Sequence, residues 1–453
     1  MNTFIRMMIA CSLVVSFMLI ASPSPAMAQL QPGYSSGIQV ANLEAEEATI
    51  TITAYDTGGG IAATINDTVP ANGSVTYVGA SMPVNEGFSG AFVISSNKQT
   101  AALSNILSAN GELGAAYVGS DVGGVSILLP LLQKQVFGYS TWYSVQNAGS
   151  SVANVTANYS TGEQVQVQVP VGAAHVFYQD QEGHAANSTF SAEITSDQPI
   201  VAAVIQEDSS TMFSYTGFNR ATDTSTNPAF PLINSNNFGF VTGVQIQNAS
   251  ETNTDTTVTL SYTPSLGGTA CTETQTIPAG QSSTFTLGAF NVNGNAGIDT
   301  TCIAGETFIG AAKVTANSAD QPLVGMGSQL LPGTFGEAYG SFSPSKATNQ
   351  VVMPLIMDRV FGYNTGFNIV HVGGPASTVN CTYSNSSVTE SAELAVDGAF
   401  TAQQRDRIAD TYVGSATCTA GAGTQIIAVV NELRVGSPAT DQFLVYEGVS
   451  VGQ

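Results

Sequence analysis

The sequence predicts an all-β protein in which four tandem β-sandwich units follow a cleaved signal peptide. The 453 residues exceed the ~100–200 residues of a typical domain. Landmarks recur four times at intervals of roughly 100 residues, enough for each unit to bury its own core. Short alternating segments are separated by turns rich in Gly, Pro, Asn and Asp, which is typical of a β-sandwich. No stretch has the sustained helical periodicity that a βαβ fold requires.

A short signature marks the start of three of these units. It is a proline followed by two aliphatic residues, with a Phe-Gly pair shortly after, and its copies begin at Pro130, Pro231 and Pro354. An alternating strand follows each copy, and the segment around Gly33 gives a fourth copy that lacks the proline. We therefore predict a signal peptide over 1–28 and β-sandwich units over 29–125, 126–225, 226–345 and 346–453.

Tyrosines recur at two later positions of the repeat. Equivalent positions in four units indicate packing in the core or at sandwich corners. The first set ends the second strand of each unit, and the second set closes the unit: Tyr55, Tyr159, Tyr262 and Tyr383, then Tyr117, Tyr215, Tyr339 and Tyr446.

The signatures are also the expected connections between units. They are short and apolar rather than rich in Gly and Ser, so we expect them to pack along adjacent sandwiches as stiff connectors. Four units of ~30 Å placed end to end form a semi-rigid rod of about 100–130 Å.

Composition excludes two broad classes of protein. Ten Lys and Arg face 32 Asp and Glu, which gives a net charge of −22. A nucleic-acid binder needs basic residues for phosphate contacts, so that class is excluded. A disordered chain lacks apolar residues to bury, whereas 43% of this chain is hydrophobic and only 9% is charged.

The N-terminal segment predicts export. Arg6 gives a positive start, an apolar stretch follows, and Ala26-Met27-Ala28 is a small-residue cleavage site. Cleavage there makes Gln29 the first mature residue. We expect a secreted protein at the cell surface, with no membrane insertion after signal cleavage.

The cysteines of the mature chain are even in number, which in an exported protein favours disulfides. Three pairings are possible for Cys271, Cys302, Cys381 and Cys418. The repeat places the first two in the third unit and the last two in the fourth, which favours Cys271–Cys302 and Cys381–Cys418. A metal site is disfavoured, because no Cys-x-x-Cys spacing occurs.

With these features together, the chain resembles tandem immunoglobulin-like β-sandwich modules of bacterial secreted and cell-surface proteins. The resemblance rests on the signal peptide, on strands such as Val145 to Gly149, on the Val169 to Gly172 turn and on the 196–201 hairpin. It implies a stalk, spacer, adhesive unit or surface-layer component, and it transfers no catalytic residues. The chain departs from antibody domains because two units have no cysteine.

Motifs of catalysis find structural explanations. Asp56-Thr57-Gly58 matches half of an aspartic protease site, but it aligns with a hairpin turn of the next unit and has no second copy. Ser450 matches a nucleophile elbow but has no downstream acid or His. His175, His184 and His371 form no predicted cluster. We expect no enzyme, no catalytic residue, no cofactor and no metal.

Two acidic loops are the best candidates for calcium, 251–255 and 406–410. Neither has the ligand spacing of a calcium loop, and the signature contributes at most one acid, Asp358. A solvated acidic surface explains both loops more simply.

The leading hypothesis is an exported, non-enzymatic structural or adhesive rod of the cell surface, with self-association or cell-wall and surface glycans as partners and no nucleic acid. The alternative is a secreted glycan- or ligand-binding protein with its site on loops of the second unit. Trp142 replaces a glycine of the other units and is the predicted exposed ligand contact, with Gln179 to His184 beside it.

Overall fold

The computed structural model describes residues 33–451, apart from 83, 86, 109–111, 287–298, 319–320, 361, 435–440 and 442. The predicted signal peptide and its cleavage site lie outside the described residues. Nearly all regular structure is β-strand in antiparallel sheets, with one short α-helix and two short 3₁₀ helices among the described residues, so the all-β prediction is confirmed.

The first unit is a two-sheet sandwich with strand orders β4-β1-β6-β7 and β3-β2-β5. Along β2 the side chains of Ile50, Ile52 and Ala54 are buried and alternate with more exposed residues, the pattern of a strand with one face on a core. The elements are β1 (Ser35–Asn42), β2 (Ala48–Asp56), β3 (Ile61–Val69), β4 (Ser74–Tyr77), the 3₁₀ helix η1 (Gly79–Ser81), β5 (Gly90–Ser96), β6 (Thr100–Leu107) and β7 (Gly114–Val118).

The second unit differs because one strand of 20 residues joins both layers. The first half of β13 pairs with β10 and β8, and its second half pairs with β9 and β14. The elements are β8 (Gly124–Lys134), β9 (Ser140–Asn147), β10 (Ala153–Tyr159), β11 (Gln164–Val169), β12 (Ala174–Tyr178), β13 (Ser188–Glu207), β14 (Met212–Thr216), β15 (Phe218–Asn219) and α1 (Arg220–Asp223).

The third and fourth units repeat the two-sheet plan, with β20-β17-β23-β24 and β29-β26-β31-β32 as the sheets that reach the centre. The third has β16 (Ala229–Ser235), β17 (Val241–Asn248), β18 (Thr256–Gly267), β19 (Cys271–Ile277), β20 (Ser282–Phe285), β21 (Asp299–Thr300), β22 (Phe308–Ala316), β23 (Leu323–Leu331) and β24 (Phe335–Gly340). The 3₁₀ helix η2 (Pro344–Lys346) precedes the fourth, which has β25 (Gln350–Asp358), β26 (Tyr363–Gly373), β27 (Ser377–Tyr383), β28 (Thr389–Leu394), β29 (Ala399–Gln403), β30 (Tyr412–Thr419), β31 (Gln425–Arg434), β32 (Phe443–Glu447) and β33 (Val449–Ser450).

Both predicted disulfides are confirmed. Cys271 is bonded to Cys302, and Cys381 is bonded to Cys418, which lies opposite it on the neighbouring strand. Disulfides persist in oxidising compartments, so the bonds fit an extracellular environment. Among the described residues, no helix has the length and apolar character needed to cross a membrane.

The proline signature lies within the first strand of its unit, which corrects its assignment as a connector. The pairing of β8, β16 and β25 shifts register at Pro130, Pro231 and Pro354, where proline has no N–H to donate. The hydroxyl of the closing tyrosine donates to the carbonyl of the leucine after each proline, at 2.7 Å from Tyr215 to Leu131. Tyr339 and Tyr446 do the same in the next two units. The tyrosine therefore anchors a bulge in its own sandwich.

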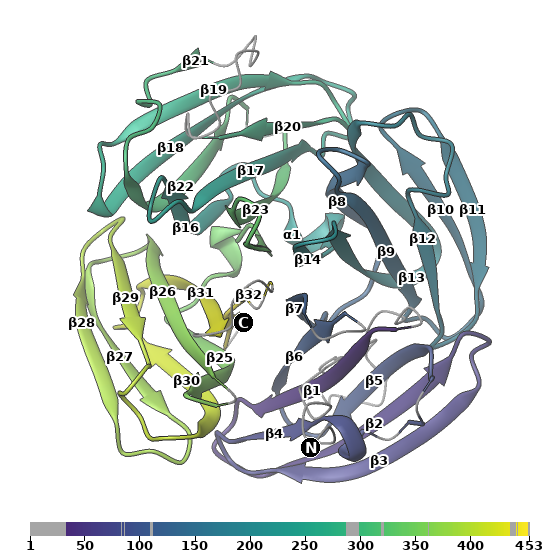
Figure 1. The fold of residues 1–453 in the computed structure, drawn as a ribbon, viewed down its shortest axis with the longest axis horizontal. Coiled ribbons are helices and arrows are strands. Elements are labelled where there is room, and N and C mark those ends of the chain that lie inside the picture. The colour runs from purple at the N-terminus through teal and green to yellow at the C-terminus, as the bar shows by residue number, and fades with distance from the viewer. Residues whose placement is uncertain are drawn as a thin grey trace.

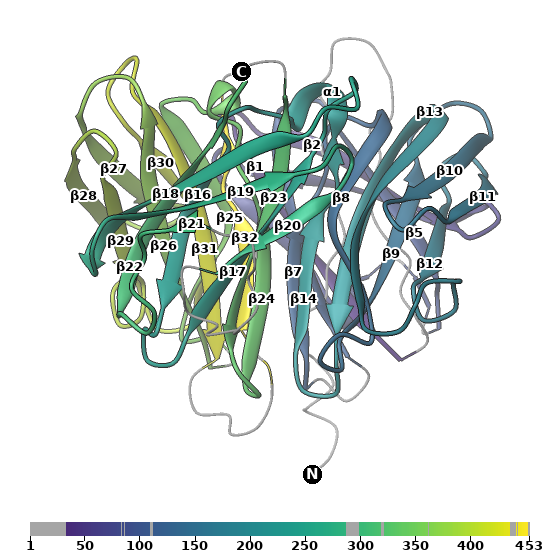
Figure 2. The ribbon, with the colours of Figure 1, turned by 90° about the horizontal axis from the view of Figure 1, so that it is seen from above.

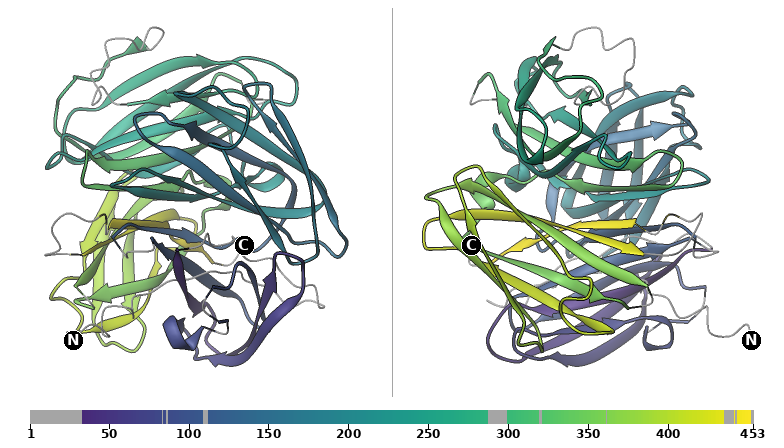
Figure 3. Two further views of the ribbon diagram at one scale, coloured as in Figure 1. Left: turned by 45° about the vertical axis from the view of Figure 1, so that its right-hand side comes forward. Right: turned by 60° about the vertical axis from the view of Figure 1, so that its left-hand side comes forward.

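The four units close into a ring, and the predicted end-to-end rod is wrong. Figure 1 looks into the ring, with β7, β14 and β32 near its middle, and the oblique views of Figure 3 show the sandwiches gathered side by side. The inner strands β7, β14, β24 and β32 lie around one line, here called the central axis. The fourth unit packs against the first, because Leu103 and Ala116 share a core cluster with Tyr446 and its neighbours.

Ring closure follows from apolar surface that neighbouring units bury together. Each of the four largest core clusters contains residues of two units, for example Trp142 and Met212 among residues of the first unit. Small residues let the inner strands approach closely. A Cβ on Gly336 would lie 2.3 Å from the ring of Phe213, so only glycine allows the observed contact of β24 with β14.

Candidate functional site

Trp142 is not the exposed ligand contact that the sequence predicts. Its side chain is 4% exposed and lies between the first two units. The indole N–H donates to Glu207 at 3.0 Å, and the ring meets that of Tyr34 edge to face. The bulky residue replaces glycine here because it fills a contact between the first and second units.

The predicted loop beside Trp142 is buried at both of its ends. Gln179 and His184 are buried, and His184 lies against the rings of Tyr159 and Phe190. The two imidazole nitrogens of His184 lie 3.4 Å from a carboxylate oxygen of Glu163 and 3.5 Å from one of Glu182. These groups pack the ends of the loop onto its own sandwich, whereas Asp180, Gln181 and Gly183 between them are exposed.

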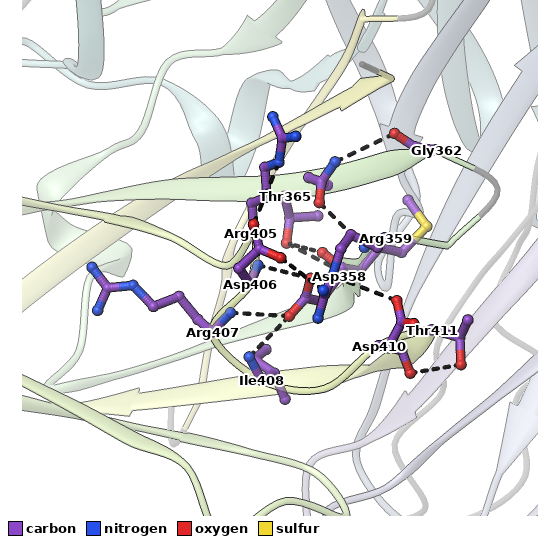
Figure 4. A network of polar contacts seen from close by, with 12 residues as sticks. Asp358, Arg359, Gly362, Thr365, Arg405, Asp406, Arg407, Ile408, Asp410 and Thr411 are labelled. Atoms are coloured by element: carbon purple, nitrogen blue, oxygen red, sulfur yellow. Dashed lines mark hydrogen bonds and ion pairs between the residues drawn. The ribbon is translucent and has the colours of Figure 1, made fainter. Parts of the chain in front are cut away.

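The acidic loop at 406–410 is held by protein groups (Figure 4). Asp358 accepts backbone N–H bonds from Asp406, Arg407 and Ile408, at 3.0, 3.1 and 2.9 Å. Arg359 lies 2.9 Å from Asp358 and 2.7 Å from Asp406. Burial opposes the charge on Asp358, but these donors outweigh it and hold the pKa of the carboxyl below its usual value. The guanidinium of Arg359 thus supplies the positive charge beside these carboxylates.

Other candidates have local structural roles. Asp56 accepts N–H bonds from Gly58 and Gly60 within its hairpin turn. Asp255, in the other acidic loop, accepts the N–H of Ala279 at 3.3 Å. Among the described residues, no group of three or more His, Cys, Asp or Glu side chains is arranged to hold a metal ion.

The central axis is tied together by a buried carboxylate that sequence reasoning missed. Glu337 of β24 accepts the backbone N–H of Ala116 on β7 at 3.0 Å. It also accepts the N–H of Ser214 on β14 at 2.6 Å and that of Ala338 at 2.7 Å. Inner strands are sheet edges with unpaired N–H groups, so one side chain satisfies edges of three units. Burial raises the pKa of Glu337 well above its usual value, and the donated hydrogen bonds oppose that rise.

A second carboxylate brings in the fourth unit. Asp441 accepts the N–H of Met212 at 2.9 Å and that of Gly336 at 3.2 Å. Burial raises the pKa of Asp441 to about 8. Burial likewise raises the pKa of Glu432 to about 8, and Asn105 of the first unit donates to it at 3.5 Å. The axis is therefore a line of buried acids whose partners come from neighbouring units.

A pocket opens at the end of the axis where the inner strands finish. It has a volume of about 450 Å³, and all four units contribute to its wall, with Val118, Thr216, Gly340 and Glu447 from the ends of the inner strands. A second pocket of about 330 Å³ shares part of this wall. Residues of α1 line the pocket, so this end of the axis is at the top of Figure 2.

The wall combines charged, hydroxyl and aromatic groups. Lys346 is paired with Asp223, and Asp121 is exposed beside them. Phe342 is partly exposed, and Glu447 accepts the N–H of Gly340. Burial raises the pKa of Glu447 above its usual value. Hydroxyl groups complete the wall: Ser120, Thr216, Thr222, Ser341, Ser343 and Ser450.

The pocket could not be found from the repeat, because its residues are separated in sequence and meet only when the ring closes. No family model matches the chain, and no curated protein is similar to it.

Proposed function

We propose that this protein is an exported, non-enzymatic adhesive protein of the cell surface, built from immunoglobulin-like modules, that binds a glycan in the pocket at the end of its central axis. The pocket itself carries the proposal, because four units converge there on a mixed polar and aromatic wall. The predicted signal peptide and the two disulfides support export.

The groups in the pocket suit a sugar. Carboxylates such as Asp121 accept hydrogen bonds from sugar hydroxyls, and serine and threonine hydroxyls both donate and accept. A partly exposed aromatic ring such as Phe342 offers an apolar face to the C–H side of a sugar ring. A concave site with a few convergent polar groups is the usual form of a ligand pocket.

Binding to an oligosaccharide array tests this function. The full exported protein is expected to bind a subset of glycans, and calorimetry then gives the affinity for the best of them. Phe342→Ala and Asp121→Asn are each expected to weaken binding at least about tenfold, since each removes a stacking surface or an acceptor.

Asp299→Asn is the matched control, because Asp299 is exposed on β21 and lies outside the pocket. It is expected to leave the affinity unchanged. Glycan binding that both pocket variants retain would place the site elsewhere, and no binding to any glycan would remove the proposal.

A further inference from the structure

Two hairpins carry a fully exposed phenylalanine at the tip. Val136 and Tyr139 exchange two backbone hydrogen bonds of 2.9 Å, which leaves Phe137 and Gly138 as a two-residue turn. Asn237 and Phe240 exchange bonds of 3.2 and 2.9 Å around Phe238 and Gly239. The side chain of Phe137 is 90% exposed and that of Phe238 is 95% exposed.

The backbone at both tips is unfavourable for phenylalanine. Phe137 has φ 52° and Gly138 has φ 95°, and the values at Phe238 and Gly239 are 50° and 88°. A two-residue hairpin turn with both φ angles positive strongly prefers Asn-Gly, because Asn tolerates the left-handed region better than a bulky residue does. Phenylalanine at these positions costs stability and buries nothing, so folding does not explain it.

Both tips lie at the same end of the ring, opposite the pocket. Ser140, just after the first tip, pairs with Glu207, which pairs with Met212 at the start of β14. Val241, just after the second tip, pairs with Leu330, which pairs with Gly336 near the start of β24. The pocket is at the other end of these inner strands.

A third pair of residues, Val360 and Tyr363, also exchanges two backbone hydrogen bonds, of 3.1 and 2.8 Å. In the sequence Phe361 takes the place of the two exposed phenylalanines, and it lies outside the described residues.

No charged side chain belongs to the two described tips, 135–139 and 236–240. Inserting them into an apolar phase would therefore desolvate no charge of their own. Two separate phenylalanines present ~150–250 Å² each, which is well below the ~800 Å² per partner of a specific protein interface. A fluid lipid interface takes up separate aromatic side chains without needing complementary pockets.

We propose that this end of the ring rests on a zwitterionic lipid surface, with Phe137 and Phe238 inserted among the headgroups. The net charge of −22 makes an anionic membrane an unfavourable partner. This contact would orient the pocket away from the membrane. It is independent of the proposed glycan binding, because pocket variants are expected to keep it.

Sedimentation with phosphatidylcholine vesicles tests the contact. The full exported protein is expected to sediment with the vesicles, and Phe137→Asn combined with Phe238→Asn is expected to reduce the bound fraction at least tenfold. The same double variant is expected to have an equal or higher Tm, since Asn suits both turns. A double variant that still folds but no longer binds vesicles would show that the two phenylalanines contact the lipid rather than stabilise the fold.

The control is Val152→Asn combined with Leu266→Asn, which replaces two exposed apolar side chains outside the tips. It is expected to sediment like the native protein. The proposal is overturned if the native protein stays in solution, or if the tip variant sediments with vesicles as well as the native protein does. A native dimer that the tip variant converts to monomer would also overturn it, in favour of a second copy as the partner.

Fluorescence provides an independent readout. Trp142 is the single tryptophan and is buried, so its emission is a constant background. Phe238→Trp places a second indole at the tip, and its emission is expected to shift to shorter wavelength when phosphatidylcholine vesicles are added. An unshifted spectrum in the presence of vesicles would contradict insertion of this tip.

Discussion

Replacing Glu337 by alanine is expected to lower the free energy of unfolding by about 3–5 kcal/mol. The backbone N–H groups of Ala116, Ser214 and Ala338 lose their acceptor at once, in a region closed to solvent. Urea unfolding followed by circular dichroism measures the change. Because three units share this side chain, the loss is expected in the cooperative unfolding of the ring.

Two variants make this result specific. Glu337→Gln keeps one acceptor oxygen but turns an NH₂ group toward a backbone donor, so an intermediate loss is expected. Glu251→Ala removes an exposed carboxylate and is expected to change stability by no more than about 0.5 kcal/mol. A Glu337→Ala protein as stable as the Glu251→Ala protein would show that the carboxylate does not hold the inner strands.

Raising the pH from 5 to 9 is expected to lower the free energy of unfolding by roughly 8 kcal/mol, about 4 kcal/mol from each of two buried acids. Burial raises the pKa of Asp441 and that of Glu432 to about 8 in the folded ring. At any pH between the ordinary carboxyl pKa of about 4 and the raised value of about 8, the folded state therefore binds more protons than the unfolded state. The stability that these two protonated acids contribute is fully present below their unfolded pKa values and is lost as the pH rises through 8. His175 acts in the opposite direction near pH 6.5, because burial lowers its pKa.

Glu432→Gln isolates one contribution to this pH dependence. The neutral amide keeps an oxygen that accepts the hydrogen bond from Asn105. Asn105 Oδ1 has no hydrogen-bond partner among the described residues, so it is free to accept from the new NH₂ group. The variant is expected to be more stable than the native protein at pH 9 and to have a shallower dependence on pH. Equal slopes in thermal unfolding from pH 5 to 9 would mean that Glu432 does not titrate as a buried group.

The repeat made the local fold predictable. Recurring tyrosines and turns located the strands, and assigning each cysteine to its unit identified both disulfides, because these features depend on contacts within one sandwich. The bulge at Pro130 was misread as a connector. A proline followed by aliphatic residues can occur in a connector between domains or at a bulge in a strand, where the missing N–H of proline is tolerated, and composition does not distinguish the two.

Contacts between units were not predictable from the repeat. Glu337 and Asp441 do not recur at the equivalent positions of the other units. Their donors are backbone N–H groups, which carry no sequence signal. A lone acid within an apolar, glycine-rich strand, such as Glu337 between Gly336 and Ala338, was the one available hint. Trp142 was assigned to the surface for the same reason, because a contact between the first two units covers it.

Small-angle X-ray scattering of the protein at pH 6 tests ring closure most directly. A compact chain of this length has a radius of gyration of about 22 Å, and the ring predicts a value near this together with a compact distance distribution. A rod of ~120 Å has a radius of gyration of about 35 Å and an extended distribution. The second result would contradict the ring, and with it the axial carboxylate contacts and the pocket that four units form.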